Sequence, residues 1–505
     1  MPLTLIIFLL LPLWLQAMSL PVDTSATVLP AAATPQPAPL PAFPTAEGFG
    51  AQAVGGRGGR IIYVSKLTDT GEPGTLRSAL EAFGPRVVLF KVAGTIRLKK
   101  DIAIKNPFVT IAGQTAPGEG VQIRGGTIKI KMHDVIIRYL KMRPGDETAG
   151  TESKPVNRDA ITLEAVEGVE VYNIVIDHCS MVWGPDAGID IFNNSHHVTI
   201  QYSIIGEGLN FSTHPKGSRP GGHSKGLLIT QLDPQRYGPG WPRYLTIHHN
   251  LITTSEDRNP RVIGGEFIDV VNNVVYNWGW HTAGGNPRSL NLIKNVFIRG
   301  PQTKKLKAWE ADTSDVLPTL FLKSVYEEGN ATEGFNTVRC GPSSVYTTTR
   351  FAPYSMGTEH TPRQVYDLIV RDVGANRPAR DATDQRILNN LLHRTGEFVS
   401  GVKFGLTWPE LASGPVAADL DQDGMPEQWE QLHFGTTKRG SPTDSSGDLD
   451  ADGYTDVEEY LNQTDPKVPD TRLARLTARA TSSRASGLSS GLCHFLLRLT
   501  ATLAF

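Results

Sequence analysis

Short strands recur along this chain at a nearly constant spacing, and that spacing limits the folds open to it. The interval from Ile174 to Val198 is 24 residues, and those from Leu245 to Ile268 and from Ile268 to Asn291 are 23 residues each. The runs at these positions are short and rich in β-branched residues, with turns between them. A repeat of this kind predicts a solenoid in which each coil of strands stacks on the preceding coil.

The segments between the strands favour the same fold. The 47 residues from Val198 to Leu245 are interpreted as two steps of the repeat, with Leu227 between them. Asparagine tolerates the left-handed backbone of tight turns and can stack into ladders, and it follows several strands, at Asn250, Asn272, Asn273 and Asn295. An antiparallel sandwich would show hairpin turns at shorter spacing. We therefore predict a parallel β-helix.

The composition limits the classes of partner. Lys plus Arg (49) nearly balances Asp plus Glu (51), giving a net charge of -2, so we expect no nucleic-acid binding. A polyanionic ligand would have to be met by local groups of basic residues. The cysteines are Cys179, Cys340 and Cys493, which leaves open one bridge plus one free thiol.

The chain divides into six segments. Leu5 to Leu15 is almost wholly apolar and is followed by the small residues Ala17 and Ser19, which predicts a secretory signal peptide, with a membrane anchor as the less favoured interpretation. No other long apolar run occurs, so we expect no membrane association after signal removal. The expected segments are a signal peptide (1–19), a Pro/Ala-rich linker (20–46), a β-helix core (47–305), an extension with helices near 361–373 and 380–392 (306–412), two calcium loops (413–470) and a disordered Arg-rich tail (471–505).

Two acidic twelve-residue patterns lie near the C-terminus. Each carries oxygen donors around a central glycine, Gly424 or Gly453, and ends in a glutamate. Calcium prefers such oxygen sets, and the glycine permits the turn that brings them together. The predicted ligands are Asp419, Asp421, Asp423, Glu427 and Glu430 in the first loop, and Asp448, Asp450, Asp452, Asp456 and Glu459 in the second. Because Pro426 departs from the EF-hand pattern, the pair resembles the repeats of dockerins and thrombospondin type 3 modules, which suggests a structural role.

Three motifs resemble polysaccharide lyase family 1, the pectate lyases. They are Gly74-Thr75-Leu76-Arg77-Ser78-Ala79-Leu80, Val175-Ile176-Asp177-His178-Cys179-Ser180 and Arg258-Asn259-Pro260-Arg261, and the resemblance runs from about 48 to 295. It implies an all-β fold, a right-handed single-stranded parallel β-helix. It also implies a secreted enzyme that requires Ca²⁺ and acts on polygalacturonate. We expect a monomer.

The resemblance also implies roles for single residues. Asp159, Asp186 and Asp190 match calcium-binding carboxylates of the family. Lys225 matches a lysine that binds a uronate carboxylate. Arg258 matches the arginine considered the catalytic base, and Arg261 follows it as a further catalytic and substrate-binding cation. Two positions depart from the family pattern: Asn157 stands where a further Asp is common, and Ile263 stands where a third Arg is common.

Elimination chemistry requires residues of these types. The proton on C5 of a uronate is weakly acidic and becomes removable when the neighbouring C6 carboxylate is neutralised, because negative charge then develops on those oxygens. A site for this reaction needs oxygen ligands, a cation and a base. An arginine base is unusual, since its free pKa is above about 12, so the role requires calcium and neighbouring cations to lower that pKa, or an alkaline optimum.

Rival interpretations remain open. A glycoside hydrolase on the same solenoid would use Asp186 and Asp190 as paired carboxylates without calcium. A non-catalytic carbohydrate-binding adhesin would need none of the chemistry. The pairs His196-His197 and His248-His249 could suggest zinc, but adjacent strand residues face opposite ways, so we expect buried or turn histidines. The resemblance places Asp177-His178 away from the catalytic groove, in a structural role, and Asp146 is an additional candidate carboxylate.

Overall fold

The computed structural model describes residues 40–147, 157–217, 221–232, 234–237, 239–311 and 321–470. The predicted signal peptide, most of the predicted linker, the Arg-rich tail and Cys493 lie outside these residues. The chain divides into two compact units, residues 1–39 and 40–505, and the described residues all belong to the second.

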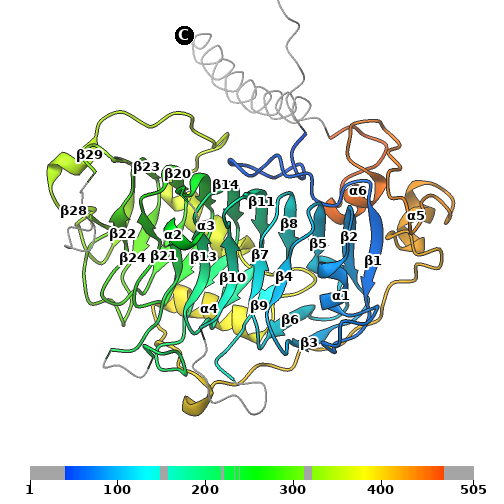
Figure 1. Ribbon diagram of the computed structural model, residues 1–505, viewed down its shortest axis with the longest axis horizontal. Coiled ribbons are helices and arrows are strands. Elements are labelled where there is room, and N and C mark those ends of the chain that lie inside the picture. Colours follow the sequence, from blue (N-terminus) through cyan, green and yellow to red (C-terminus); the bar gives the residue numbers. More distant parts are fainter. Residues whose placement is uncertain are drawn as a thin grey trace, which may run out of the picture. The chain divides into compact units, whose positions relative to one another are not determined.

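The described strands form three sheets, and every ladder between them is parallel (Figure 1). Sheet A contains β1 (Arg60–Val64), β2 (Arg86–Phe90), β5 (Val109–Ala112), β8 (Val135–Arg138), β11 (Val171–Asp177), β14 (Ser195–Gln201), β17 (Arg243–His248), β20 (Glu266–Val271), β23 (Leu290–Ile293), β26 (Val325–Glu328) and β29 (Tyr346–Thr347). Sheet B contains β3 (Gly94–Arg97), β6 (Val121–Arg124), β9 (Lys141–Met142), β12 (Ser180–Val182), β15 (Ile204–Gly206), β18 (Leu251–Thr253), β21 (Val274–Tyr276), β24 (Val296–Ile298) and β27 (Ala331–Glu333). Sheet C contains β4 (Ile102–Ile104), β7 (Ile128–Ile130), β10 (Asp159–Glu164), β13 (Ala187–Phe192), β16 (Leu227–Thr230), β19 (Arg261–Ile263), β22 (Ala283–Asn286), β25 (Trp309–Ala311) and β28 (Arg339–Cys340).

Each coil contributes one strand to each sheet in turn, which is the predicted parallel β-helix. Inward side chains of successive coils form one stack of Val, Ile and Leu, and Ile176 at its centre is fully buried. Truncating such a residue to Ala costs about 2–5 kcal/mol. The asparagines expected at turns also stack, since Asn250, Asn273 and Asn295 form a hydrogen-bonded ladder that continues to Asn330.

The register confirms part of the predicted repeat and corrects the rest. Ile174 pairs with Val198, and Leu245 pairs with Ile268, as the spacing predicts. Val198 pairs directly with Leu245, so the 47 residues between them are one coil rather than two. Leu227 begins β16, which belongs to sheet C, and a long loop separates β16 from the preceding strand, β15. Ile268 pairs with Leu290, one residue before the expected Asn291.

The solenoid also extends beyond its expected limits. Strands β25 to β29 continue the three sheets past the predicted core boundary at Lys305. At the other end, Ala42, Phe43 and Ala46, assigned from sequence to the linker, are buried against Ile136 and Val175 on sheet A. Gly50 makes this approach possible, because a Cβ there would lie 2.3 Å from the carbonyl oxygen of Ile174 on β11.

Helices of the C-terminal region cover parts of the outer faces of sheets A and B, whereas the short helix at Leu76–Glu81 packs into the solenoid core. The α-helices are α1 (Leu76–Glu81), α2 (Pro234–Tyr237), α3 (Pro362–Asp372), α4 (Ala382–His393), α5 (Glu427–His433) and α6 (Asp456–Asn462), with 3₁₀ turns η1 (Gly113–Thr115), η2 (Ser343–Val345) and η3 (Val402–Phe404). Helices α3 and α4, near the positions predicted from sequence, pack on sheet B (Figure 1). Buried Arg143 of sheet B holds α4 by pairing with Asp381 and Asp384. Among the described residues, none of the helices combines the length and apolar character that crossing a bilayer requires.

Candidate active site

Three carboxylates gather on the outer face of sheet C. Along β13, Ile189 and Ile191 face the core while Asp190 faces outward, as strand alternation requires. Asp159 begins β10, the neighbouring strand, and pairs in register with Ala187, just after Asp186. The ligand oxygens of Asp159, Asp186 and Asp190 all lie within 4.8 Å of one another. The three residues predicted to share a metal ion are therefore brought together by two stacked coils.

The electrostatics of this cluster favour a cation. Burial, followed by repulsion from Asp190 and Asp186, raises the pKa of Asp159 well above its usual value. Burial also raises the pKa of Asp190 to about 7, although Arg258 acts in the opposite direction. Oδ1 of Asp159 and Oδ1 of Asp190 are both buried without a hydrogen-bond partner among the described residues. Buried, unsatisfied carboxylate oxygens are costly, so the donor set fits a divalent ion such as Ca²⁺.

Two histidines that the sequence analysis missed support Asp186. Nε2 of His223 lies 2.9 Å from Asp186 Oδ1, and the ring of His223 stacks on that of His214 with centroids 4.1 Å apart. Nε2 of His214 lies 2.7 Å from Oδ1 of Asn157. The side-chain oxygen of Asn157, at the position where the family pattern has a further Asp, is therefore hydrogen-bonded to a histidine. Asp146 is also engaged elsewhere, since it accepts hydrogen bonds from the backbone amides of Thr213 and Val402.

Arg258 reaches the acidic cluster from the next loop. Its Nη1 lies 3.5 Å from Asp190 Oδ2 and 3.7 Å from Asp186 Oδ1. Burial would lower the pKa of Arg258, but Asp190 and Asp186 outweigh burial and raise it. Gly226 is required beside this loop, because a Cβ there would lie 2.5 Å from the carbonyl oxygen of Arg258. Without a cation on the carboxylates, the guanidinium is held protonated.

Lys225 and Arg261 lie on the same groove. A pocket of about 500 Å³ is lined by Lys216, His223, Lys225, Leu228, Asp257, Arg258, Arg261 and Ile263. Nζ of Lys225 lies 3.4 Å from Glu256 Oε2 and 3.5 Å from Asp257 Oδ2, and Nη1 of Arg261 lies 3.7 Å from Asp257 Oδ2. Burial raises the pKa of Asp257, but Lys225 and Arg261 together lower it below its usual value.

Three charged residues at this groove were not predicted: Glu256, Asp257 and Lys216. Glu256 and Asp257 immediately precede the Arg258 motif, and that position was their only sequence signal. Lys216 lines the pocket that also contains Ile263, the position where the family pattern has a third arginine. It supplies a cation on the same pocket wall.

The first predicted calcium loop gathers part of its ligand set. Asp419, Asp421 and Asp423 form a group whose ligand oxygens lie within 4.8 Å of one another. Glu430 is fully buried with Oε2 unpartnered among the described residues, and burial raises its pKa to about 7. Glu427, in contrast, accepts a hydrogen bond from the backbone amide of Leu420.

The second loop repeats this arrangement. Asp448, Asp450 and Asp452 form the corresponding group. Glu459 is fully buried, and neither of its carboxylate oxygens has a partner within the described part of the chain. Burial, followed by repulsion from Asp450, raises the pKa of Glu459 to about 9. Asp456 accepts from the backbone amide of Leu449 and pairs with Arg439.

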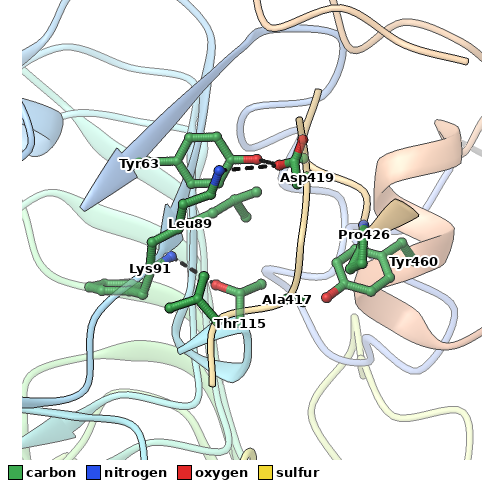
Figure 2. Close-up of a pocket in the computed structure, with 11 residues that line it drawn as sticks. Tyr63, Leu89, Lys91, Thr115, Ala417, Asp419, Pro426 and Tyr460 are labelled. Atoms are coloured by element: carbon green, nitrogen blue, oxygen red, sulfur yellow. Dashed lines mark hydrogen bonds and ion pairs between the residues drawn. The ribbon is translucent and has the colours of Figure 1, made fainter. Parts of the chain in front are cut away.

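The first loop is attached to the start of the solenoid (Figure 2). The hydroxyl of Tyr63 on β1 donates to Asp419. Nζ of Lys91 lies 3.6 Å from Asp419 Oδ2 and 3.6 Å from the centre of the Tyr63 ring. Beneath these contacts, Met425, Val457 and Leu461 pack on outward apolar residues of β1 and β2. The loops are thus packed against the outer face of sheet A at the start of the solenoid.

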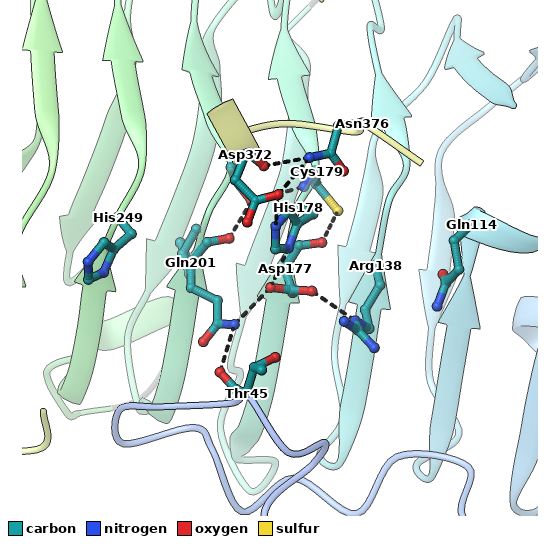
Figure 3. A network of polar contacts seen from close by, with 12 residues as sticks. Thr45, Gln114, Arg138, Asp177, His178, Cys179, Gln201, His249, Asp372 and Asn376 are labelled. Atoms are coloured by element: carbon teal, nitrogen blue, oxygen red, sulfur yellow. Dashed lines mark hydrogen bonds and ion pairs between the residues drawn. The ribbon is translucent and has the colours of Figure 1, made fainter. Parts of the chain in front are cut away.

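The Asp177-His178 motif lies on sheet A, in a buried polar network (Figure 3). The Asp177 carboxylate accepts from Arg138 Nε and Gln201 Nε2, each at 2.8 Å, and lies 2.8 Å from His178 Nδ1. Nε2 of His178 lies 3.6 Å from Asp372 at the end of α3. These contacts join successive coils and attach a helix, in agreement with a structural role.

The histidine pairs are also parts of packed stacks. Within each pair the two Nδ1 atoms are close, 2.7 Å apart in His196-His197 and 2.8 Å in His248-His249. Burial lowers the pKa of His248 to about 3. Neither pair belongs to a metal-binding group among the described residues. Cys179 and Cys340 are both free thiols, so the open alternative of a bridge between them is excluded.

Comparisons with known proteins find relatives in sequence and a similar fold. No family model matches the sequence. The chain is 32% identical over 442 residues to a probable pectate lyase C of Aspergillus flavus, covering 85% of this chain and 94% of that protein. It is 33% identical over 444 residues to a probable pectate lyase C of Aspergillus terreus, with the same coverage of 85% and 94%. Jun a 1, the major allergen from cedar pollen, matches in structure with a TM-score of 0.51 at 20% identity, covering 65% of this chain and 92% of that chain.

Proposed function

The chain belongs to the pectate lyase family and is a polysaccharide lyase acting on pectate, and we propose that it cleaves polygalacturonate by calcium-assisted β-elimination to give unsaturated oligogalacturonides. The main support for this mechanism is that a cluster of carboxylates lies next to a group of basic side chains. Asp159 and Asp190 present buried oxygens without a partner among the described residues. Arg258 lies 3.5 Å from Asp190, and Lys225 lines the same pocket as Arg258. A hydrolase has less need of these cations.

The acidic cluster is the proposed metal site. Asp159, Asp186 and Asp190 would hold Ca²⁺, and His223 orients Asp186 by hydrogen bonding. When bound, the ion supplies positive charge that stabilises the developing charge on the substrate carboxylate. Asn157 is neutral, and its side-chain oxygen contacts His214. The proposed site therefore has one fewer anionic ligand than the common family pattern.

The cations of the groove are assigned to substrate and proton transfer. Lys225 and Arg261 bind uronate carboxylates, and their pairing with Asp257 holds both side chains along the pocket wall. Arg258 removes the C5 proton. It lies against the carboxylates whose charge raises its pKa, so neutralising those carboxylates is what prepares it to act as a base.

The C-terminal loops, secretion and oligomeric state complete the proposed function. The two C-terminal loops bind Ca²⁺ and serve stability, since Oε2 of Glu430 and both carboxylate oxygens of Glu459 are buried without a hydrogen-bond partner among the described residues. The apolar segment at 5–15 directs secretion. The enzyme acts as a monomer.

The hydrolase alternative has one observation in its favour. Burial raises the pKa of Asp190 to about 7, which suits a general acid. However, the oxygens of the acidic cluster lie within 4.8 Å of one another, closer than the roughly 5–9.5 Å that separates glycosidase carboxylates.

One assay separates the alternatives. Polygalacturonate and methylated pectin are incubated with the protein, with and without Ca²⁺, and unsaturated product is followed by its ultraviolet absorbance. Elimination creates a C4–C5 double bond that absorbs, whereas hydrolysis does not. Reducing ends that appear without ultraviolet absorbance would establish hydrolysis. No cleavage with retained binding would favour the adhesin.

A further inference from the structure

An exposed tryptophan lies on the loop that follows the Arg258 loop by one coil. Trp280 follows β21 and is 46% exposed. Its neighbours are fixed: Trp278 is fully buried and donates through Nε1 to the carbonyl oxygen of Lys305 at 2.7 Å, and Gly279 donates its amide to Ser255. A large aromatic ring is therefore held at the surface by an anchored backbone.

This ring lies one coil beyond the proposed base. The amide of His281 donates to Glu256, and Asn259 Nδ2 donates to the carbonyl oxygen of His281 at 3.0 Å. Strand β22, which follows Trp280, pairs with β19, which follows Arg258 (β22 is labelled in Figure 1). Adjacent strands are about 4.8 Å apart, a step close to that of one sugar in an extended polysaccharide.

One lysine lies over the ring, and two more follow it in the sequence. Nζ of Lys304 lies 4.9 Å from the centre of the Trp280 ring. Lys305 and Lys307 follow on the same loop, and both approach Glu310, at 3.7 and 3.0 Å. Lys304 is exposed and forms no ion pair with a described residue. In a chain with a net charge of -2, this group is a local site for an anionic ligand.

We propose that Trp280 and Lys304 form an additional binding subsite for an acidic polysaccharide. One face of the indole packs a sugar ring, while Lys304, held on the other side by its cation–π contact, pairs with a uronate carboxylate. The assignment of polygalacturonate as the ligand rests on the proposed function. The subsite contributes to affinity and not to bond cleavage.

The test uses full-length protein and galacturonate oligomers of increasing length. For the wild type, kcat/KM should rise with chain length until the oligomer spans both Arg258 and Trp280. Trp280→Ala should lower kcat/KM on the hexamer about tenfold, which corresponds to about 1.4 kcal/mol, through KM and with kcat within twofold. Lys304→Met should act in the same direction, and Lys304→Arg should restore binding. An equal effect on dimer and hexamer, or none on the hexamer, would overturn the subsite.

Matched controls and a binding measurement separate this result from the proposed function. Phe83→Ala and Lys438→Met change an exposed aromatic and an exposed lysine elsewhere, and both should leave kcat/KM unchanged. Calorimetric titration of hexagalacturonate is then repeated in an Arg258→Ala background, with and without Trp280→Ala. If the wild type makes no unsaturated product but Trp280→Ala still weakens binding about tenfold, the subsite stands and the lyase proposal fails. If product forms but affinity is unchanged, the subsite fails alone.

Discussion

Nη1 of Arg258 lies 3.5 Å from Oδ2 of Asp190, so the proposed base is paired with a proposed metal ligand. Asp190 lies on β13, and Arg258 lies on the loop that leads into β19; β16 pairs with both of these strands. The pair raises the pKa of the arginine against the effect of burial. Base and metal site are thus electrostatically linked, and removing either partner should affect the other in a measurable way.

Replacing Arg258 should separate catalysis from metal binding. Arg258→Ala should lower kcat by about 10²–10⁴-fold, the contribution typical of a positioned general base. It should also bind Ca²⁺ at least as tightly as the wild type, because the guanidinium repels a cation at Asp190. Steady-state kinetics and calcium calorimetry check the two effects. Arg261→Ala is the matched control, since Arg261 pairs with Asp257 instead, and it should mainly raise KM. Wild-type turnover in Arg258→Ala would remove the base assignment.

Removing one charge from the acidic cluster should have opposite effects with and without metal. Burial raises the pKa of Asp190 to about 7, above its unfolded value of about 3.9. An ionised Asp190 therefore destabilises the metal-free fold increasingly as pH rises from about 4 to 7, and the cost is fully present at pH 8. In chelator at pH 8, Asp190→Asn should melt at a higher temperature than the wild type.

With Ca²⁺ the order should reverse. Asp190→Asn should need more calcium for half-maximal rate, and chelation should abolish wild-type activity. Asp367→Asn, on the exposed surface of α3, should change neither the melting temperature nor the calcium dependence. Thoroughly demetallated wild type that retains full activity would contradict the metal-assisted mechanism.

The sequence predicted the solenoid because strands that stack in register must recur at one coil length. It failed at the step from Val198 to Leu245, because periodicity does not tell which sheet a strand joins, and Leu227 has the same apolar pattern as strands of sheet A. The acidic cluster was predictable from motif and coil spacing. His214 and His223 were not, since single polar residues in an irregular loop carry no periodic signal and meet only after folding.

The C-terminal loops should stabilise the protein without taking part in chemistry. Calcium at a hundredfold excess over its Kd should add about 2.7 kcal/mol to the free energy of unfolding. Glu459→Gln should lose much of this calcium-dependent gain, because Glu459 is buried with unpartnered oxygens among the described residues. With the active site saturated with Ca²⁺, kcat should stay within twofold. Thermal melts across a calcium series and parallel kinetics give the comparison.

Removing the whole module is a harsher test of the same idea. Deleting 419–459 uncovers Ile61, Val87 and Leu89 on β1 and β2, so we expect a lower melting temperature and aggregation. Turnover per folded molecule should nevertheless persist. A well-folded truncation without turnover would show that the loops contribute to the reaction.

The pair Asp177–His178 should make stability depend on pH in a defined direction. Burial lowers the pKa of His178, but the Asp177 carboxylate outweighs burial and raises it above 6.5. The resulting stabilisation is fully present below the unfolded pKa of about 6.5 and is lost as pH rises through the higher folded value. His178→Gln should therefore cost about 1–3 kcal/mol at pH 5.5 and clearly less at pH 9. His393→Gln, at an exposed site on α4, is the control, and it should cost little stability at either pH value. Denaturant melts at the two pH values measure both, and a His178→Gln deficit that grows toward pH 9 would contradict a charged histidine in this network.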